Sequence, residues 1–161
     1  MERYNWKILN RQQVGAFTEY FVKMELTMFG FQVYTTEVDD RGIDFVARMD
    51  RGPFLEIQVK SLRDSKYMFA QKDKFPIEEN VFLALGILAQ GHPPELYLIP
   101  SLAWKDCKER ESNAFVDRDY EGLKSKPEWG INVAKKNMTE LAQYTFTKTI
   151  EQLSRRSDQR R

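Results

Sequence analysis

Apolar residues recur every three or four positions over residues 11–29, which predicts an amphipathic helix. Gly30 follows the last of them, where a helix is expected to stop. A second helix is predicted over 102–110 and a third over 139–153, the latter with a capping box between Asn137 and Glu140. The core-facing stripe predicted for the first helix is Val14, Phe17, Phe21, Met24 and Met28.

Between these helices the pattern changes to short runs that are rich in β-branched and aromatic residues, bounded by turn signals. Residues 111–136 are polar and irregular, so a loop or an insertion is expected there. The order of helix, strands and helices predicts an α/β or α+β sandwich around one mixed sheet. The predicted strands cover 31–38, 43–48, 54–61, 66–70, 80–88 and 95–100.

Length and composition narrow the class of protein. A chain of 161 residues fits one domain, expected over 1–153, with a frayed basic tail at 154–161. An aromatic content of 13% excludes general disorder. A single cysteine excludes an intramolecular disulfide and a cysteine zinc cluster, and a single histidine excludes a metal site with paired histidines. No apolar run reaches the ~20 residues of a membrane span, and the N-terminus lacks a signal peptide, so a cytoplasmic protein without a membrane partner is expected.

The turn over 50–53 suggests a hairpin whose chemistry depends on its register. If the hairpin is centred on Arg51, then Asp44 lies opposite Gln58, and these two side chains share a face with Lys60. The other face of the hairpin is then wholly apolar and builds the core. A slip of one residue would exchange the two faces.

The polar face of this hairpin has the groups that a hard divalent cation prefers. Mg²⁺ takes oxygen ligands, commonly one or two carboxylates with waters and substrate phosphate. Asp44 offers a carboxylate, Gln58 an amide oxygen and Val59 a backbone carbonyl. Lys60 projects beside them, where an ammonium can hold the attacking water or offset charge on a scissile phosphate. Attack of a metal-activated water on a phosphodiester is the chemistry that this set suggests.

These residues resemble the PD-(D/E)XK nuclease superfamily over roughly residues 12–100. The resemblance lies in Gly42-Ile43-Asp44 and Gln58-Val59-Lys60 around a tight turn, after a helix with Gly15 and Glu19 that ends at Gly30-Phe31. It is similar to the branches with Gln in the second motif and to the archaeal Holliday-junction resolvase and restriction-endonuclease-like arrangement. It implies a restriction-endonuclease-like α-β-β-β-α-β core, with a mixed sheet flanked by helices.

The resemblance also implies roles for residues and partners. Glu19 matches the helix carboxylate of the first motif, Asp44 the metal carboxylate, Gln58 the (D/E/Q) position and Lys60 the motif lysine. It implies a Mg²⁺- or Mn²⁺-dependent endonuclease on DNA, with RNA also open, acting as a homodimer because a duplex has two strands to cut. Two departures stand out: Ile43 replaces the usual Pro, and Gln58 replaces the commoner Glu, which lowers the negative charge of the site.

Other interpretations remain open at this point. The polar face of the hairpin also fits a solvated sheet face, and Glu19 also fits a surface helix position, with Glu25 as its competitor. Glu56 suits either an extra ligand or a salt-bridge partner. The loss of an acid at Gln58 also fits a catalytically inactive module that binds nucleic acid or protein, and a purely structural domain is a third possibility.

Cationic residues beyond the hairpin are candidates for contacts with a nucleic-acid backbone. Those directly after the second motif are the preferred ones: Arg63, Lys66 and Lys72. The later lysines at 105, 108, 124, 126, 135 and 136 fit phosphate contacts and a solvated surface equally well. His92 and Cys107 are expected to be a loop residue and an unreactive thiol.

Overall fold

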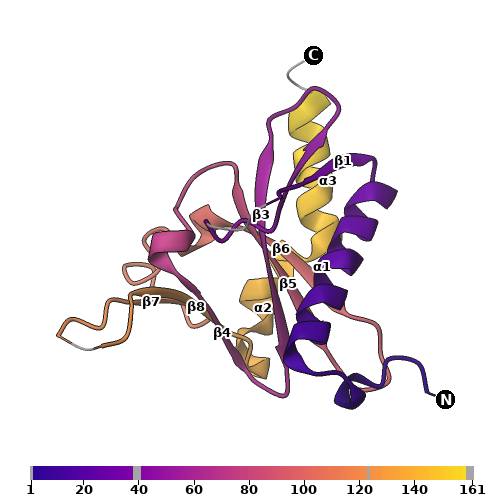
Figure 1. Ribbon diagram of the computed structural model, residues 1–161. Coiled ribbons are helices and arrows are strands. Elements are labelled where there is room, and N and C mark those ends of the chain that lie inside the picture. Colours follow the sequence, from indigo (N-terminus) through magenta and orange to yellow (C-terminus); the bar gives the residue numbers. More distant parts are fainter. Residues whose placement is uncertain (1, 38–40, 123, 159–161) are drawn as a thin grey trace.

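The main sheet carries five strands in the order β1-β2-β3-β5-β6 (Figure 1). The computed structural model describes residues 2–37, 41–122 and 124–158. β3 and β5 run parallel, and the other neighbouring pairs run antiparallel. The strands are β1 (Phe31–Thr35), β2 (Phe45–Met49), β3 (Leu55–Arg63), β5 (Val81–Leu88) and β6 (Glu95–Pro100).

Helices cover one face of this sheet, and a second sheet covers the other (Figure 1). α1 (Arg11–Met28) and α3 (Phe146–Asp158) pack on the face that contains Phe45 and Ile57. The small sheet has the order β4-β8-β7 and buries its inner side against Leu83 and Leu85 of β5. Its strands are β4 (Tyr67–Gln71), β7 (Phe115–Arg118) and β8 (Glu128–Asn132).

Every strand predicted up to residue 100 is present, with shifted ends. The turn predicted at Asp39–Gly42 lies partly outside the described residues. Gly30 ends α1 as predicted, in the left-handed conformation with φ +86° that glycine adopts without a Cβ penalty. Among the described helices, none is both long and apolar enough to cross a membrane.

Of the core-facing stripe predicted for α1, Val14 is confirmed and the remaining positions were wrong. Met24 and Met28 are 57% and 80% exposed, and Phe17 and Phe21 are only half-buried on one flank. The buried row instead has strict four-residue spacing: Val14, Thr18, Val22 and Leu26. A polar residue fits this row because Thr18 Oγ1 donates a hydrogen bond to Val14 O at 2.9 Å, which satisfies the hydroxyl inside the helix.

The segment 111–136 was predicted as a loop, but it supplies strands β7 and β8. Their polar residues have local partners: Asp117 binds Lys72, and Glu128 accepts a hydrogen bond from Tyr67 at 2.7 Å. The helix predicted over 102–110 was also wrong, since only a 3-10 turn over Ser101–Trp104 forms, followed by further turns.

The late helix predicted over 139–153 is split in two. α2 (Met138–Leu141) and α3 are separated at Thr145, whose extended backbone forms a bridge with Tyr97 of β6. The predicted capping box is absent, because the Asn137 amide donates instead to Asn113 O and Asn132 O, each at 2.9 Å. α3 continues to Asp158, past the predicted start of a frayed tail at Ser154.

Two glycines provide a matched test of how closely α1 packs on the sheet. A Cβ on Gly86 of β5 would lie 2.6 Å from Thr18 Cγ2, whereas a Cβ on Gly15 would have no neighbour within 4 Å. Gly86→Ala is expected to lower the free energy of unfolding by about 1–3 kcal/mol through overpacking. Gly15→Ala is expected to raise it by up to ~1 kcal/mol, because alanine is the better helix former. Urea denaturation measures both, and equal effects would contradict this packing.

Candidate active site

The candidate site lies where β2 begins and β3 continues without it. The two strands pair only from Ala47–Leu55 to Phe45–Ile57. This is the predicted register, centred on Arg51, and it turns Phe45 and Ile57 into the helix-covered core. Among the described residues, β3 pairs beyond Ile57 with β5 alone, so its other edge has no described strand partner from Gln58 to Arg63 and is called the open edge of β3. An open edge leaves backbone groups for side chains or ligands to use.

Asp44 uses this open edge. Its backbone N–H donates to Ile57 O at 2.9 Å, which continues the β2–β3 ladder by one residue. Its Oδ2 then accepts the Val59 N–H at 2.5 Å, so a side chain takes the place of a strand acceptor. The N–H and C=O of one strand residue point to the same side, so Val59 O also faces the open edge beside Asp44.

Gln58 is buried, with only 8% of its surface exposed. Its Nε2 donates to Gly42 O at 2.6 Å, and its Oε1 has no hydrogen-bond partner among the described residues. A buried amide oxygen that lacks a partner costs about 1–3 kcal/mol. Gly42 makes this arrangement possible, because its φ is +78° and a Cβ there would lie 2.8 Å from Gln58 Nε2.

Lys60 follows Gln58 by two residues on β3, so both side chains leave the same face of the sheet. Lys60 is half-buried and forms neither a hydrogen bond nor an ion pair within the part of the chain that the structure describes. Its ammonium is therefore available to a ligand. The structure brings Asp44, Gln58, Val59 and Lys60 together as the sequence indicates.

Glu19 lies on α1, the helix that packs on the face of the main sheet containing Phe45. It pairs with Lys23 one turn along the helix, with 2.5 Å between Lys23 Nζ and Glu19 Oε1. Lys23 Nζ also lies 5.3 Å from the centre of the Phe45 ring. This flank of α1 therefore faces the start of β2, the residue after Asp44. To bind a cation at the site, Glu19 would have to exchange its pairing with Lys23.

The remaining acidic candidates are less well placed. Glu56 Oε1 accepts a hydrogen bond from Asn80 Nδ2 at 3.3 Å, which assigns it a structural partner on the next segment. Glu25 is half-buried on α1. Among the described residues, no group of three or more Asp, Glu, His or Cys side chains has the geometry to hold a metal ion. A cation here would depend on Asp44, the Gln58 and Val59 oxygens, water and a ligand.

Two of the three residues predicted to contact nucleic acid have intramolecular partners. Arg63 Nη1 donates to Trp6 O and, at 2.8 Å, to Leu9 O, and so fastens the N-terminal segment to β3. Lys66 is exposed, and its side chain forms no hydrogen bond or ion pair with the described residues. Contact of these three residues with nucleic acid stays a prediction. Lys66 is the one of them whose ammonium has no hydrogen-bond or ion-pair partner among the described residues.

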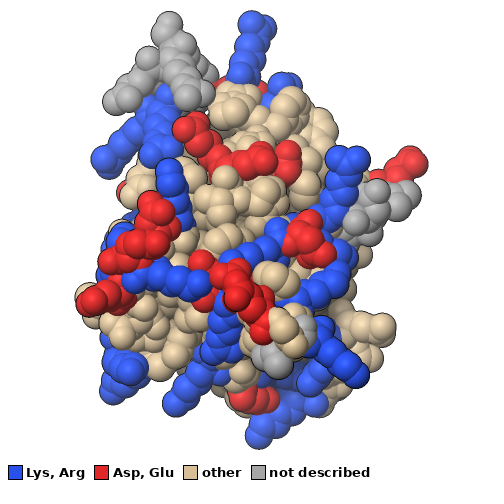
Figure 2. Space-filling view, turned by 90° about the vertical axis from the view of Figure 1, so that its left-hand side faces the viewer, with Lys and Arg blue, Asp and Glu red and all other residues tan. Residues whose placement is uncertain are grey.

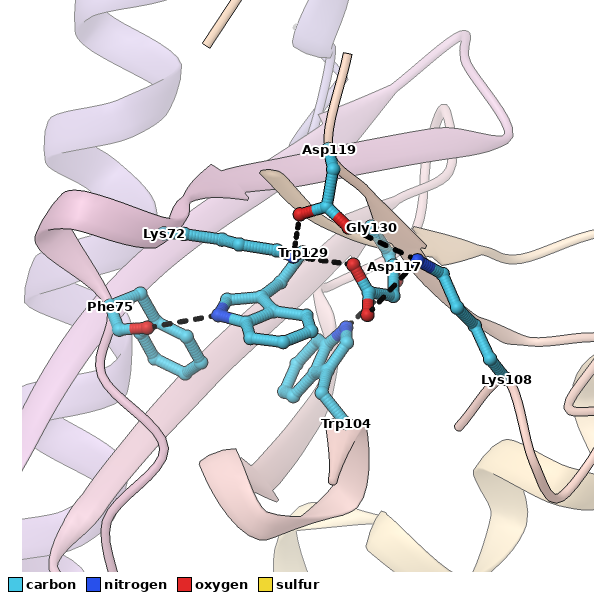
Figure 3. Close-up of polar contacts among 8 residues, drawn as sticks. All are labelled: Lys72, Phe75, Trp104, Lys108, Asp117, Asp119, Trp129 and Gly130. Carbon is cyan, nitrogen blue, oxygen red and sulfur yellow. Dashed lines mark hydrogen bonds and ion pairs between the residues drawn. The ribbon is translucent and has the colours of Figure 1, made fainter. Parts of the chain in front are cut away.

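Lys72 is the centre of an ion cluster with Asp117, Asp119 and Lys108 (Figure 3). Its Nζ also lies 4.1 Å from the centre of the Trp129 ring. Burial alone would lower the pKa of Lys72, but its hydrogen bonds to Asp117 and Asp119 outweigh burial and raise it. The hydrogen bonds from Lys72 and Lys108 in turn lower the pKa of Asp119. Lys72 is thus an internal tie between β4, β7 and β8.

The two residues that were expected to be inert behave as structural ones. His92 is exposed in a loop, and its backbone carbonyl accepts the Trp6 indole N–H at 3.1 Å. Cys107 is buried, and burial raises the pKa of its thiol, which disfavours the reactive thiolate. Neither residue adds chemistry to the candidate site.

The outer surface on the side of the small sheet has no uniform sign of charge. Figure 2 shows acidic and basic side chains interleaved across it. The chain has 25 basic and 24 acidic residues, so its formal net charge is +1 at pH 7. On this surface, attraction for an anionic polymer would come from particular unpaired cations rather than from a broad basic patch.

Similarity to known proteins is found in the fold rather than in the sequence. No protein-family model matches the sequence, and no curated protein matches it either. The structure is similar to Hjc, a Holliday junction resolvase from the archaeal hyperthermophile Archaeoglobus fulgidus, with a TM-score of 0.55 and 14% identity. The match covers 85% of this chain and 95% of that chain. A second match, to the bacterial homing endonuclease I-Ssp6803I, has a TM-score of 0.43 and 17% identity, and covers 57% of this chain and 66% of that one.

The similarity to Hjc confirms the predicted fold class. The five-stranded mixed sheet with flanking helices has the restriction-endonuclease-like arrangement that PD-(D/E)XK nucleases share. The second helix of the predicted α-β-β-β-α-β order was wrong, because the chain between β3 and β5 instead forms β4, a strand of the small sheet, and a 3-10 turn over Lys72–Lys74. At 14% identity the match speaks for the fold alone. The chain shares the fold of Hjc, with Asp44, Gln58 and Lys60 at the open edge of β3.

Proposed function

We propose that this protein is a Mg²⁺- or Mn²⁺-dependent endonuclease that hydrolyses phosphodiester bonds in DNA. The observation that carries the proposal is the arrangement at the open edge of β3. There the Asp44 carboxylate is held by Val59 N–H, and the Gln58 Oε1 is buried without a partner in the described chain. A buried acceptor of this kind beside a fixed carboxylate is the donor set that a hard cation uses.

The residues fit a cation that is held partly by the substrate. Mg²⁺ often keeps several waters and binds through one or two carboxylates together with substrate phosphates. Asp44 would supply the carboxylate, and Gln58 Oε1 and Val59 O two neutral oxygens, with Glu19 as a further ligand if it leaves Lys23. Replacing an acid by Gln58 leaves less negative charge, so affinity in the absence of DNA is expected to be weak.

Each residue then has a defined task. Asp44 fixes the position of the cation, because its other bonds lock it to the β3 edge. The Lys60 ammonium offsets the charge that develops on the scissile phosphate and orients the attacking water. When bound, the cation supplies Lewis acidity toward a phosphoryl oxygen and makes water a better nucleophile at neutral pH. The homodimer expected from the sequence would present two such sites to a duplex.

One alternative has specific support: a catalytically inactive module of the same fold that binds nucleic acid or protein. The support is the Gln at position 58, the Glu19–Lys23 pair, and the absence of a three-carboxylate group among the described residues. The two functions differ in their dependence on Asp44. An inactive module binds DNA without cleavage, and its binding does not change when Asp44 loses its charge.

Cleavage is predicted to depend on Asp44 and Lys60. The assay uses supercoiled plasmid, single-stranded DNA and a four-way junction, each with Mg²⁺, Mn²⁺ or EDTA. Asp44→Asn and Lys60→Ala are each expected to lower the cleavage rate at least ~100-fold, because preorganised charge at the reacting phosphate supplies that order of acceleration. Lys148→Ala, at an exposed lysine of α3 on the helix-covered side of the main sheet, is the control and is expected to cleave at the normal rate.

Two results would contradict the proposal. Full activity in Lys60→Ala would show that the site is misassigned. No cleavage with any metal and any substrate, together with DNA binding that Asp44→Asn leaves unchanged, would favour the inactive module. Folding of each variant is checked by its urea unfolding midpoint.

Gln58→Glu is predicted to lower the stability of the metal-free protein and to raise its affinity for the metal. The introduced carboxylate cannot donate to Gly42 O, so the metal-free variant should be less stable than the natural chain by about 1–3 kcal/mol at pH 7. Burial without a partner raises the pKa of the new carboxyl above its unfolded value, so this loss appears as pH rises and disappears below about pH 4. Mn²⁺ should restore stability more in the variant than in the natural chain. Thermal unfolding across pH and Mn²⁺ concentration measures this, and a variant unaffected by Mn²⁺ would contradict the site.

A further inference from the structure

We propose that Lys74 and Lys60 together form a phosphate-binding corner beside Asp44 and Gln58, and that the small sheet fixes Lys74 there. The ligand is a backbone phosphate of the DNA that is bound for cleavage. The inference rests on the proposed function and assigns a substrate contact to a segment outside the motifs that suggested that function.

The first observation is the contact between Lys74 and the Gly42 turn. Lys74 follows β4 in a 3-10 turn, η2 (Lys72–Lys74). Its Cβ lies 2.9 Å, and its carbonyl oxygen 3.2 Å, from the place that a Cβ of Gly42 would take. Gln58 Nε2 lies 2.8 Å from the same place. The stem of Lys74 therefore packs at the turn that holds the Gln58 amide.

The second observation is that Lys74 differs from its charged neighbours. Lys72 is held by Asp117 and Asp119, and Asp73 is paired with Lys126 at 2.9 Å. Lys74 is exposed and forms no ion pair or side-chain hydrogen bond within the described residues. It is thus the one unpaired charge of η2, and it starts from the Gly42 turn.

The third observation is that contacts of Lys72 and Phe75 fix η2 in place (Figure 3). Phe75, the next residue, is 1% exposed and meets the Trp104 ring edge-on, with 5.4 Å between ring centres. Its carbonyl accepts the Trp129 indole N–H at 3.1 Å. Lys72 N–H donates to Pro127 O at 3.0 Å. These contacts join η2 to β8 and to the ion cluster, so they fix the position from which the Lys74 side chain extends.

Lys60 supplies the second cation of the corner. Its side chain leaves β3 on the same face as Gln58, the face that the small sheet and η2 cover. Both lysines lack an intramolecular partner among the described residues. Two unpaired ammonium groups beside a single carboxylate suit a phosphodiester, whose charge they share with the cation. Each lysine that neutralises a phosphate releases condensed counterions, so it adds to the salt dependence of binding.

Binding without cleavage tests the inference. A fluorescein-labelled four-way junction and a duplex are titrated in EDTA and in Ca²⁺, and Kd is measured by anisotropy at several salt concentrations. Lys74→Ala keeps the Cβ that packs at Gly42 and removes the rest of the side chain, including the ammonium. It is expected to weaken binding about five- to tenfold at 0.1 M salt and to reduce the slope of log K against log salt by about one.

Matched variants define the outcomes. Lys148→Ala, also at an exposed lysine but on α3, which packs on the opposite face of the main sheet, is expected to leave Kd and slope unchanged. Lys74→Arg keeps the charge and is expected to keep the slope. If the unsubstituted protein binds but Lys74→Ala matches it, or Lys74→Arg loses the slope, the inference alone is overturned. If the unsubstituted protein binds neither DNA, the proposed function falls, and this inference falls with it.

Discussion

The antiparallel register of β2 and β3 is the constraint on which the rest of the site depends. Pairing of Phe45 with Ile57 turns the apolar residues of both strands toward α1 and α3, and it brings Asp44 to the point where β2 begins. Asp44 then completes the edge of β3 by accepting the Val59 N–H. A slip of one residue would bury the polar face among the helices and expose the core, so folding and the site are enforced by the same pairing.

Gly42 and Gln58 add a second level of order. The positive φ of Gly42 aims its carbonyl at the Gln58 amide, and the same turn leaves just enough room for Lys74. The amide is thereby oriented by its donor side, with its acceptor left unpaired among the described residues. A glutamate could not use the Gly42 carbonyl in this way. The Gln at this position is therefore part of a matched pair with Gly42, and its neutral oxygen is available for a ligand.

Much of this was predictable from the hairpin sequence, because strand alternation and a tight turn specify both register and faces. The stripe on α1 was not, because a helix with so many apolar residues offers several rows of three- and four-residue spacing. The true row passes through Thr18, whose hydroxyl is satisfied only by Val14 O. β7 and β8 were missed because Asp117 and Glu128 look like loop residues until Lys72 and Tyr67 are placed beside them. Lys74 had no sequence signal at all, since its importance comes from a contact with Gly42 across 32 positions.

The proposed chemistry requires a divalent cation between Asp44 and Gln58 at the open edge of β3. The most direct measurement is a crystal structure of the protein with a DNA junction and Mn²⁺, with the metal located by its anomalous scattering. We expect a peak about 2.0–2.2 Å from an Asp44 carboxylate oxygen and from Gln58 Oε1, with Lys60 beside the DNA phosphate. Bound DNA at saturating Mn²⁺ with no peak at this edge, or with the metal held elsewhere on the chain, would contradict it.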